Sequence, residues 1–317
     1  MDQPNHLISL SIVVPLFNEE LTVHEMVKRL HLSCSKVTKS YELVLVNDGS
    51  ADNTLASLKE LAANDPMIRY VSFSRNFGHQ NAVLAGIAHA KGDAIVLIDG
   101  DLQDPPELIP DMYNKYLEGY KVVYARRIQR KGETAFKKAT AKAFYKILKK
   151  ITNFNIPVDT GDFRLISREV ADHLLNMNES SKFLRGQIAW LGFRQTGIEF
   201  QRDERKAGKT KYTLKKMMKL ALDGITSFSN FPLQIATFLG FIFSFFAFLI
   251  ILYALYSKFI QHEVVTGWTS LMISSMFIGG IQLLCIGIIG EYISRISNDV
   301  KKRPPYIVEE TNCSEKP

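Results

Sequence analysis

Two long stretches without a charged residue, close to the C-terminus, constrain the fold of this chain more than any other feature. Residues 224–257 and 264–290 contain no Asp, Glu, Lys or Arg. Their apolar centres, residues 231–256 and 268–290, each exceed the roughly 20 residues that a helix needs to cross a bilayer. The alternative is a pair of buried core helices, but such runs are rare in soluble domains. The sequence therefore predicts a hairpin of two membrane-spanning helices.

Positive charge flanks this hairpin on one side only. The connector between the two spans carries a single Lys, Lys258, whereas both outer flanks are basic. The cations of the outer flanks are Lys215, Lys216, Lys219, Arg295, Lys301, Lys302 and Arg303. By the positive-inside rule, both termini and the domain before the hairpin are expected in the cytoplasm. The first ten residues are too polar and too short for a signal peptide, and the scattered thiols of Cys34, Cys285 and Cys313 suit a reducing compartment.

The net charge of +7 is concentrated in two basic stretches. Residues 126–150 hold ten Lys or Arg against one acidic residue, and residues 204–219 hold seven against one. Next to membrane spans, such surfaces are expected to meet anionic lipid rather than nucleic acid, although a solvated basic face is the plain alternative. Residues 211–228 are also amphipathic, which predicts a helix along the membrane interface that leads into the first span.

The first 230 residues alternate between apolar, strand-like runs and helix-like stretches. Strands are expected at residues 10–16, 41–46, 68–73, 94–98 and 121–125, and helices at residues 19–37, 54–63, 80–90 and 105–117. Repeated β-α units of this kind predict an α/β fold with a mostly parallel sheet covered on both faces. Ligands of such sheets bind at the carboxyl ends of the strands.

Polar side chains occupy all five of these carboxyl ends. In chain order, the tips begin at Pro15 (P-L-F-N-E-E), Asn47 (N-D-G-S), Ser74 (S-R-N-F-G), Asp99 (D-G-D) and Arg126 (R-R). Residues two apart on a strand share a face, so the two aspartates of D-G-D can point into one crevice. Carboxylates are the hard ligands that Mg²⁺ or Mn²⁺ prefers, and these cations in turn can hold a diphosphate.

Other phosphate-binding motifs are not supported by the sequence. No G-x-G-x-x-G follows the first strand, which argues against dinucleotide binding of the usual kind. The segment Gly208-Lys209-Thr210 resembles the end of a P-loop, but the glycine required five residues earlier is Asp203.

Taken together, the motifs resemble family 2 glycosyltransferases. The resemblance rests on V-P-L-F-N-E-E, N-D-G-S, R-N-F-G, D-G-D-L-Q-D-P and the hairpin that follows, and it covers about residues 7–303. The branch that the chain resembles most contains polyprenyl-phosphate glycosyltransferases, such as dolichyl-phosphate mannose synthases and bactoprenol glucosyltransferases. The resemblance implies a GT-A fold, a nucleotide-sugar donor and Mg²⁺ or Mn²⁺. It further implies transfer of one sugar, with inversion, to an undecaprenyl or dolichyl phosphate.

The resemblance also implies roles for individual residues. Those expected to bind the nucleotide-sugar are Pro15, Phe17, Asn18, Glu19, Asp48, Arg75, Asn76, Asp99 and Gly100. Those expected at the metal are Asp99, Asp101 and Gln103, with Asp101 the firm ligand. Those expected to bind the acceptor phosphate are Arg126, Arg127, Arg205, Lys209, Lys211 and Tyr212.

Two further aspartates are candidates for a general base, Asp159 first and Asp162 second. Either residue could instead position a substrate. The nucleophile is a phosphate oxygen, and a phosphomonoester with a second pKa near ~6 is largely ionised at neutral pH without help from a base.

The predicted organisation has four parts. They are a catalytic domain at residues 1–210, a juxtamembrane helix at 211–229, the hairpin at 230–292 and a cytoplasmic tail at 293–317. Gly280, Gly287 and Gly290 fall near one helical face, which favours close packing within the hairpin or in a homo-oligomer. UDP-glucose is the expected donor. The alternatives are mannose or another sugar from a GDP or UDP donor, and a non-catalytic subunit that binds nucleotide-sugar or lipid.

Overall fold

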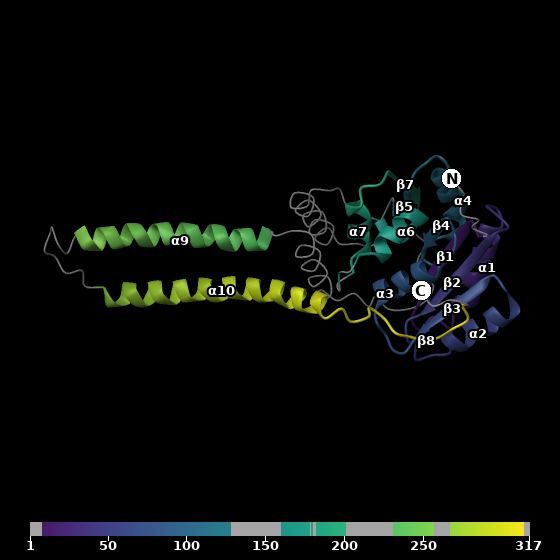
Figure 1. Cartoon of the computed structure of the whole chain (residues 1–317), viewed down its shortest axis with the longest axis horizontal. Coiled ribbons are helices and arrows are strands. Elements are labelled where there is room, and N and C mark those ends of the chain that lie inside the picture. The colour runs from purple at the N-terminus through teal and green to yellow at the C-terminus, as the bar shows by residue number, and fades with distance from the viewer. Residues whose placement is uncertain are drawn as a thin grey trace. The chain divides into compact units, whose positions relative to one another are not determined.

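The computed structural model describes residues 8–127, 160–177, 179, 182–200, 231–256 and 267–313. The chain divides into two compact units. One consists of Met1–Leu214 with Arg303–Pro317 and contains a β-sheet with its covering helices (Figure 1). The other, Lys215–Lys302, contains two long helices.

The strands of the first unit begin and end as follows: β1 (Leu10–Leu16), β2 (Tyr41–Asn47), β3 (Ile68–Phe73), β4 (Ala94–Leu97), β5 (Val122–Arg127), β6 (Thr160–Ser167), β7 (Gln195–Phe200) and β8 (Val308–Thr311). Its helices are α1 (Val23–Cys34), α2 (Thr54–Asn64), α3 (His79–His89), the 3₁₀ helix η1 (Pro106–Leu108), α4 (Ile109–Leu117), α6 (Arg168–Leu175) and α7 (Leu184–Trp190). The five expected strands and four expected helices are all present. The first helix begins later than expected because the preceding residues form a turn, in which the Thr22 N–H donates to the Glu19 carbonyl at 3.1 Å.

The eight strands form one mixed sheet in the order β7-β5-β6-β4-β1-β2-β3-β8. The central pairs β4-β1, β1-β2 and β2-β3 are parallel, as the repeated β-α units predict. Strand β6 lies between β4 and β5 and is antiparallel to both, so β5 remains parallel to β4. The carboxyl ends of β1 to β5 therefore lie along one edge of the sheet.

Two apolar layers cover the two faces of this sheet. Alternate residues of β1 belong to different layers, with Ile12 in one and Val13 in the other, as the two-residue period of a strand requires. Helices α1, α2 and α4 contribute to the Ile12 layer, and helices α3, α6 and α7 contribute to the Val13 layer. Strands β1, β2 and β4 are buried almost throughout, which explains their continuous apolar runs.

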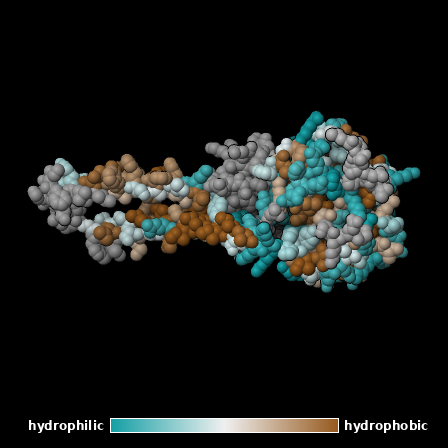
Figure 2. Space-filling view, in the orientation of Figure 1, coloured by the Kyte–Doolittle hydropathy of each residue, from teal (hydrophilic) through white to brown (hydrophobic). Residues whose placement is uncertain are grey.

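The second unit consists of α9 (Phe231–Tyr256) and α10 (Trp268–Val300). Both helices are long and apolar enough to cross a membrane, judged by length and composition. Of the most apolar window, 6% is buried in α9 and none in α10. Apolar residues accordingly dominate the visible surface of both helices in Figure 2. Because core helices of soluble proteins are mostly buried, this exposure favours membrane association over the alternative of two core helices.

Helix α10 continues ten residues beyond the expected end of the second span at residue 290. The added turns carry the charged residues Glu291, Arg295 and Asp299, so the helix extends beyond the end of its apolar segment. A Cβ built on Gly280, Gly287 or Gly290 meets nothing within 4 Å. Within the described residues these glycines therefore do not pack against α9, and the expected homo-oligomer stays a prediction.

Candidate active site

Three chemically active side chains meet at the carboxyl edge of the sheet. Asp99 follows β4, Asp162 lies on β6, and His79 is the first residue of α3. Leu97 pairs with Arg164 in the antiparallel β4-β6 ladder, so continuing the register by two residues sets Asp99 opposite Asp162. The strand pairing that the sequence does not reveal is thus what brings the two carboxylates together.

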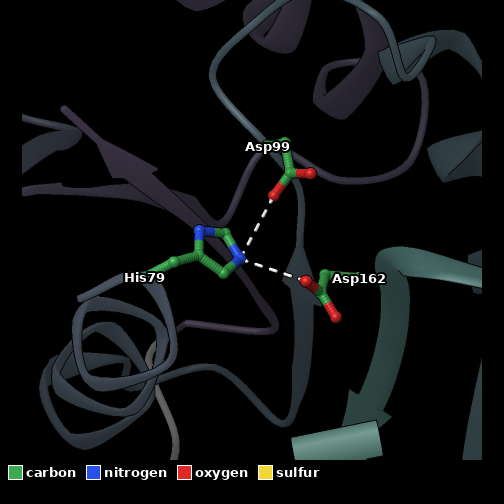
Figure 3. Close-up of side chains that lie close together, drawn as sticks. All are labelled: His79, Asp99 and Asp162. Atoms are coloured by element: carbon green, nitrogen blue, oxygen red, sulfur yellow. Dashed lines mark hydrogen bonds and ion pairs between the residues drawn. The ribbon is translucent and has the colours of Figure 1, made fainter. Parts of the chain in front are cut away.

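The imidazole of His79 bridges the two carboxylates (Figure 3). Its Nε2 lies 3.5 Å from Asp99 Oδ1 and 3.1 Å from Asp162 Oδ2. The side chains of His79, Asp99 and Asp162 are 42%, 28% and 16% exposed, so the cluster is open to solvent from the His79 side.

Two arginines surround Asp162. Arg185 of α7 donates from Nε to Asp162 Oδ1 at 2.6 Å. Arg164, on the same strand, is buried and donates to the carbonyl oxygens of Gly161 at 2.9 Å and Asp162 at 3.4 Å. Both carboxylate oxygens of Asp162 are therefore engaged, one by Arg185 and the other by His79.

These contacts shift the protonation equilibria of the cluster. Burial by itself would raise the pKa of Asp162, but Arg185 and His79 hold this pKa well below its usual value. Burial disfavours the charged form of His79, yet its hydrogen bond with Asp162 and the nearby carboxylates raise its pKa to about 9. Burial raises the pKa of Asp99, and His79 opposes that rise. Burial lowers the pKa of Arg164 to about 10, so it stays cationic at neutral pH.

The cluster has the donors that a divalent cation requires. One ligand atom from each of His79, Asp99 and Asp162 lies within 4.8 Å of the others. Asp99 Oδ1 is buried and has His79 Nε2 at 3.5 Å, but it accepts no hydrogen bond within the described part of the chain, so a cation could satisfy it more fully. Carboxylates are common ligands of Mg²⁺ and Mn²⁺, and a neutral imidazole is a common metal ligand in general. The carboxylates therefore fit a metal ion, although the imidazole would have to lose its proton before Nε2 could bind one. Asp99 belongs both to this cluster and to the ligand set expected from the sequence.

The other two expected metal residues lie in the turn that follows Asp99. The Gln103 N–H donates to Asp101 Oδ1 at 3.2 Å, and the Gln103 side chain is buried. Leu102 between them has a φ of +59°, a conformation that non-glycine residues seldom adopt. Such strain persists only where the surrounding structure enforces it, and it is frequent at functional sites. Gly100 fits the same turn because a Cβ there would lie 2.4 Å from Leu16 Cδ2.

Asp48 holds the loop that precedes α3. Its carboxylate accepts hydrogen bonds from the backbone of Phe77 at 2.7 Å and of Gly78 at 3.0 Å, and from Asn76 Nδ2 at 3.0 Å. Asp48 is buried, and burial raises its pKa while the backbone bonds lower it. Two residues expected to bind the donor, Asp48 and Asn76, thus contact each other, and their loop ends at His79.

The loop after β1 is fixed to the loop after β2. Asn18 has a φ of +57°, and its Oδ1 accepts from the Ala51 N–H at 2.9 Å. The Glu19 N–H donates to Thr54 Oγ1 at 2.9 Å. Phe17 is exposed beside them, and the Pro15 carbonyl lies near Gly100. The residues expected to bind the nucleotide-sugar therefore lie at the ends of four strands, β1 to β4, along one edge of the sheet.

Gly49, in the loop after β2, lies directly against the backbone of the loop after β3. Its φ is +63°, and an added Cβ would lie 2.3 Å from the backbone carbon of Arg75. We expect Gly49→Ala to lower the free energy of unfolding by roughly 2 kcal/mol, because positive φ and a backbone clash both oppose the methyl group. Gly119→Ala is the matched control, since Gly119 has a φ of +92° but nothing within 4 Å of its added Cβ. Thermal unfolding of both variants separates the clash from the backbone strain, and equal melting temperatures would contradict the prediction.

The residues expected to bind the acceptor phosphate are only partly placed. Arg126 ends near the same edge, where it forms an exposed ion pair with Glu199 of β7 at 3.6 Å. Within the described structure, no hydrogen bond or ion pair joins Arg126 to His79, Asp99 or Asp162, and only the backbone of Arg127 is described. Asp159, Arg205, Lys209, Lys211 and Tyr212 lie outside the described residues.

Sequence reasoning missed His79, Arg164 and Arg185. His79 follows the R-N-F-G tip directly, and Arg164 lies in the same short segment as Asp159 and Asp162. Both residues could have been predicted from these positions, because polar side chains next to the carboxyl ends of strands lie at the edge of the sheet where ligands bind. Arg185 has no such signal, since α7 reaches the edge only through its packing against the sheet.

The cluster lies where open α/β sheets bind their ligands, at the carboxyl ends of the strands. A sequence profile described as "Glycosyl transferase family 2" matches residues 11–175. The chain belongs to glycosyltransferase family 2 and is a glycosyltransferase.

Relatives match over almost the whole chain. "Uncharacterized glycosyltransferase YkcC" of Bacillus subtilis is 51% identical over 96% of this chain and 94% of its own length. "Prophage bactoprenol glucosyl transferase homolog" of Escherichia coli is 42% identical over 95% of this chain and 99% of its own. "Bactoprenol glucosyl transferase" of Shigella phage SfV is 40% identical over 95% and 98%. Because these matches extend past residue 175, the two long helices belong to the shared sequence.

Solved structures resemble about two thirds of the chain, and more distantly. Glucosyl-3-phosphoglycerate synthase from Mycobacterium tuberculosis, in complex with Mn²⁺, UDP and phosphoglyceric acid, has a TM-score of 0.44 and 20% identity, covering 68% of this chain and 75% of that one. Mannosyl-3-phosphoglycerate synthase from Rubrobacter xylanophilus has a TM-score of 0.48 and 15% identity, covering 68% and 71%.

Proposed function

We propose that this enzyme transfers one glucose from UDP-glucose to a polyprenyl phosphate at the cytoplasmic face of a membrane, with inversion and with help from Mg²⁺ or Mn²⁺. The observation that carries the proposal is the cluster of Asp99, Asp162 and His79 at the carboxyl edge, in a chain that also has two exposed apolar helices. The names of the relatives support bactoprenol, a polyprenol, as the lipid and glucose as the sugar.

In the proposed reaction, an oxygen of the lipid phosphate attacks C1 of the glucose from the side opposite the diphosphate. The new C1–O bond forms as the bond from C1 to the diphosphate breaks, and UDP leaves with the electron pair. A divalent cation, when bound, would neutralise the charge that develops on the departing diphosphate. Asp99 and Asp101 would hold that cation, with Gln103 supporting the turn between them and the next helix.

We assign Asp162 a positioning role rather than that of a base. Its two oxygens are engaged by Arg185 and His79, and its lowered pKa makes it a weak proton acceptor. The nucleophile needs little deprotonation, so correct placement contributes more than base catalysis. Asp159 stays a candidate from sequence alone. The expected acceptor residues Arg126, Arg127 and Arg205 would bind the lipid phosphate through their planar guanidinium groups.

A transfer assay tests this function directly. Membranes that contain the protein are incubated with radiolabelled UDP-glucose and undecaprenyl phosphate, and label that moves into organic solvent is counted. We expect transfer with Mg²⁺ or Mn²⁺, and a fall to background with EDTA because the diphosphate then leaves unassisted. Re-addition of metal should restore transfer. Labelled GDP-mannose is the matched donor control. Transfer from GDP-mannose alone would contradict the proposed sugar, and full activity in EDTA would contradict the metal.

A further inference from the structure

After the second long helix, the chain returns to the catalytic sheet. Strand β8 pairs antiparallel with β3 and forms the edge of the sheet. The Ser74 N–H donates to the Ile307 carbonyl at 3.2 Å, and Thr311 Oγ1 donates to the Tyr70 carbonyl at 2.7 Å. The Asn312 side chain also accepts from the Tyr70 N–H at 2.7 Å. Backbone and side chains of this C-terminal segment thus satisfy the otherwise open edge of β3.

An aromatic series connects the segment to the loop at the end of β3. The ring of Tyr306 stacks on Phe73, with centroids 5.0 Å apart and planes inclined by 14°. Phe73 in turn meets Phe77 edge to face at 5.7 Å. The Arg75 guanidinium covers the ring of Phe77 at 3.9 Å. Aromatic pairs of this geometry contribute beyond the area that they bury, so they can fix the position of the loop.

The loop held in this way is part of the candidate active site. Phe77 donates its N–H to Asp48, and the next two residues are Gly78 and His79. A displacement of Phe77 would therefore weaken the hydrogen bonds between Asp48 and the loop. It would also move the His79 imidazole, which lies between Asp99 and Asp162.

We propose that residues 306–312, here called the C-terminal strap, are a positioning element of the active site. Tyr306 is its positioning residue and acts through Phe73 and Phe77 on residues 74–79. The strap touches no reacting atom. Only residues 301–305 separate it from the end of α10, so the chain connects the catalytic unit to the hairpin through the docked strap as well as through residues 201–230. The inference rests on the proposed function, because the loop that it positions belongs to that site.

The test compares three variants of the full-length protein. Tyr306→Ala removes the stacked ring, Tyr306→Phe keeps it, and Glu309→Ala changes a solvent-exposed residue of the strap. We expect Tyr306→Ala to raise KM for UDP-glucose about tenfold with a smaller change in kcat, because a loosened loop mainly costs donor binding. Tyr306→Phe should restore KM to within about twofold, and Glu309→Ala should match the wild type within the same margin.

Hydrogen exchange supplies a readout that does not depend on sugar transfer. In Tyr306→Ala, the amides of Phe77 and Gly78 should exchange about tenfold faster than in the wild type, while those of β1 should not change. Tyr306→Leu repeats the measurement with a bulky side chain in case the alanine variant unfolds. Wild-type exchange at Phe77 and Gly78 in a folded Tyr306 variant would overturn the inference, and so would acceleration throughout the sheet. If the wild type transferred no sugar, the proposed function would fail while the exchange measurement still decided the role of the strap.

Discussion

Replacing Asp101 with asparagine is expected to lower kcat/KM for the nucleotide-sugar by about a thousandfold. The variant should fold, because an asparagine Oδ1 can still accept the hydrogen bond from the Gln103 N–H that closes the turn. What is lost is the negative charge that would hold a divalent cation beside the donor diphosphate. Steady-state transfer from UDP-glucose, measured at saturating Mg²⁺ and again at saturating Mn²⁺, checks the prediction.

Asp111→Asn is the control for this experiment. Asp111 lies in α4, eight residues after Gln103, and is exposed. It carries the same charge and undergoes the same chemical change, so it should keep activity within about twofold. Wild-type turnover by Asp101→Asn would contradict the proposed metal site, and an equal loss in both variants would point to a general effect of charge.

Replacing Asp162 with asparagine should lower kcat/KM by about a hundredfold, the usual effect of losing a side chain that orients ligands. The amide cannot balance the charges of Arg185 and buried Arg164, and it binds His79 more weakly than a carboxylate does. Arg185 and His79, which contact the carboxylate oxygens, should therefore lose their fixed positions. Transfer assays and thermal unfolding measured on the same preparation separate activity from stability.

Two companion variants complete this experiment. Arg185→Ala removes the other half of the ion pair and should reproduce most of the loss caused by Asp162→Asn, because the two groups act together. Asp172→Asn changes a mostly exposed aspartate of α6, which lies 3.9 Å from Arg168, and should leave activity unchanged. An Asp162→Asn variant with normal kcat/KM would contradict the positioning role.

The core of the fold could be predicted because its signals are local. Strands β1, β2 and β4 are buried on both faces, so each reads as a continuous apolar run bounded by polar tips. The helices between them show apolar positions at helical spacing. This spacing predicts that a segment is helical better than it predicts where the helix begins and ends. Helix α1 illustrates the error, since its start depends on a turn around Glu19 that periodicity does not reveal.

Strands β6 and β8 could not be predicted in the same way. Strand β6 buries Arg164 among apolar neighbours such as Phe163 and Leu165, and the charged residue breaks the expected pattern. Strand β8 has only four residues, two of them glutamates, and lies far from its partner β3 in the sequence. Its pairing depends on long-range contacts that no local pattern encodes.

The candidate site could be predicted only in part, because some of its residues have local sequence signals and others do not. Strand tips identified Asp48, Asn76 and Asp99 without knowledge of strand order, because the carboxyl ends of parallel strands share an edge. The proximity of Asp99 to Asp162 depends on the antiparallel insertion of β6, and the contact of Arg185 with Asp162 depends on the packing of α7. Residues brought in by tertiary structure alone leave no mark in a single sequence.

The central claim is that the acidic turn after β4 binds the cation that accompanies the donor diphosphate. Electron paramagnetic resonance of Mn²⁺ measures this directly, because the signal of free Mn²⁺ falls as the ion binds. We predict that UDP-glucose tightens Mn²⁺ binding to the wild type, and that Asp99→Asn and Asp101→Asn each weaken binding about tenfold or more. Wild-type Mn²⁺ affinity in both variants, with the donor present, would contradict the account.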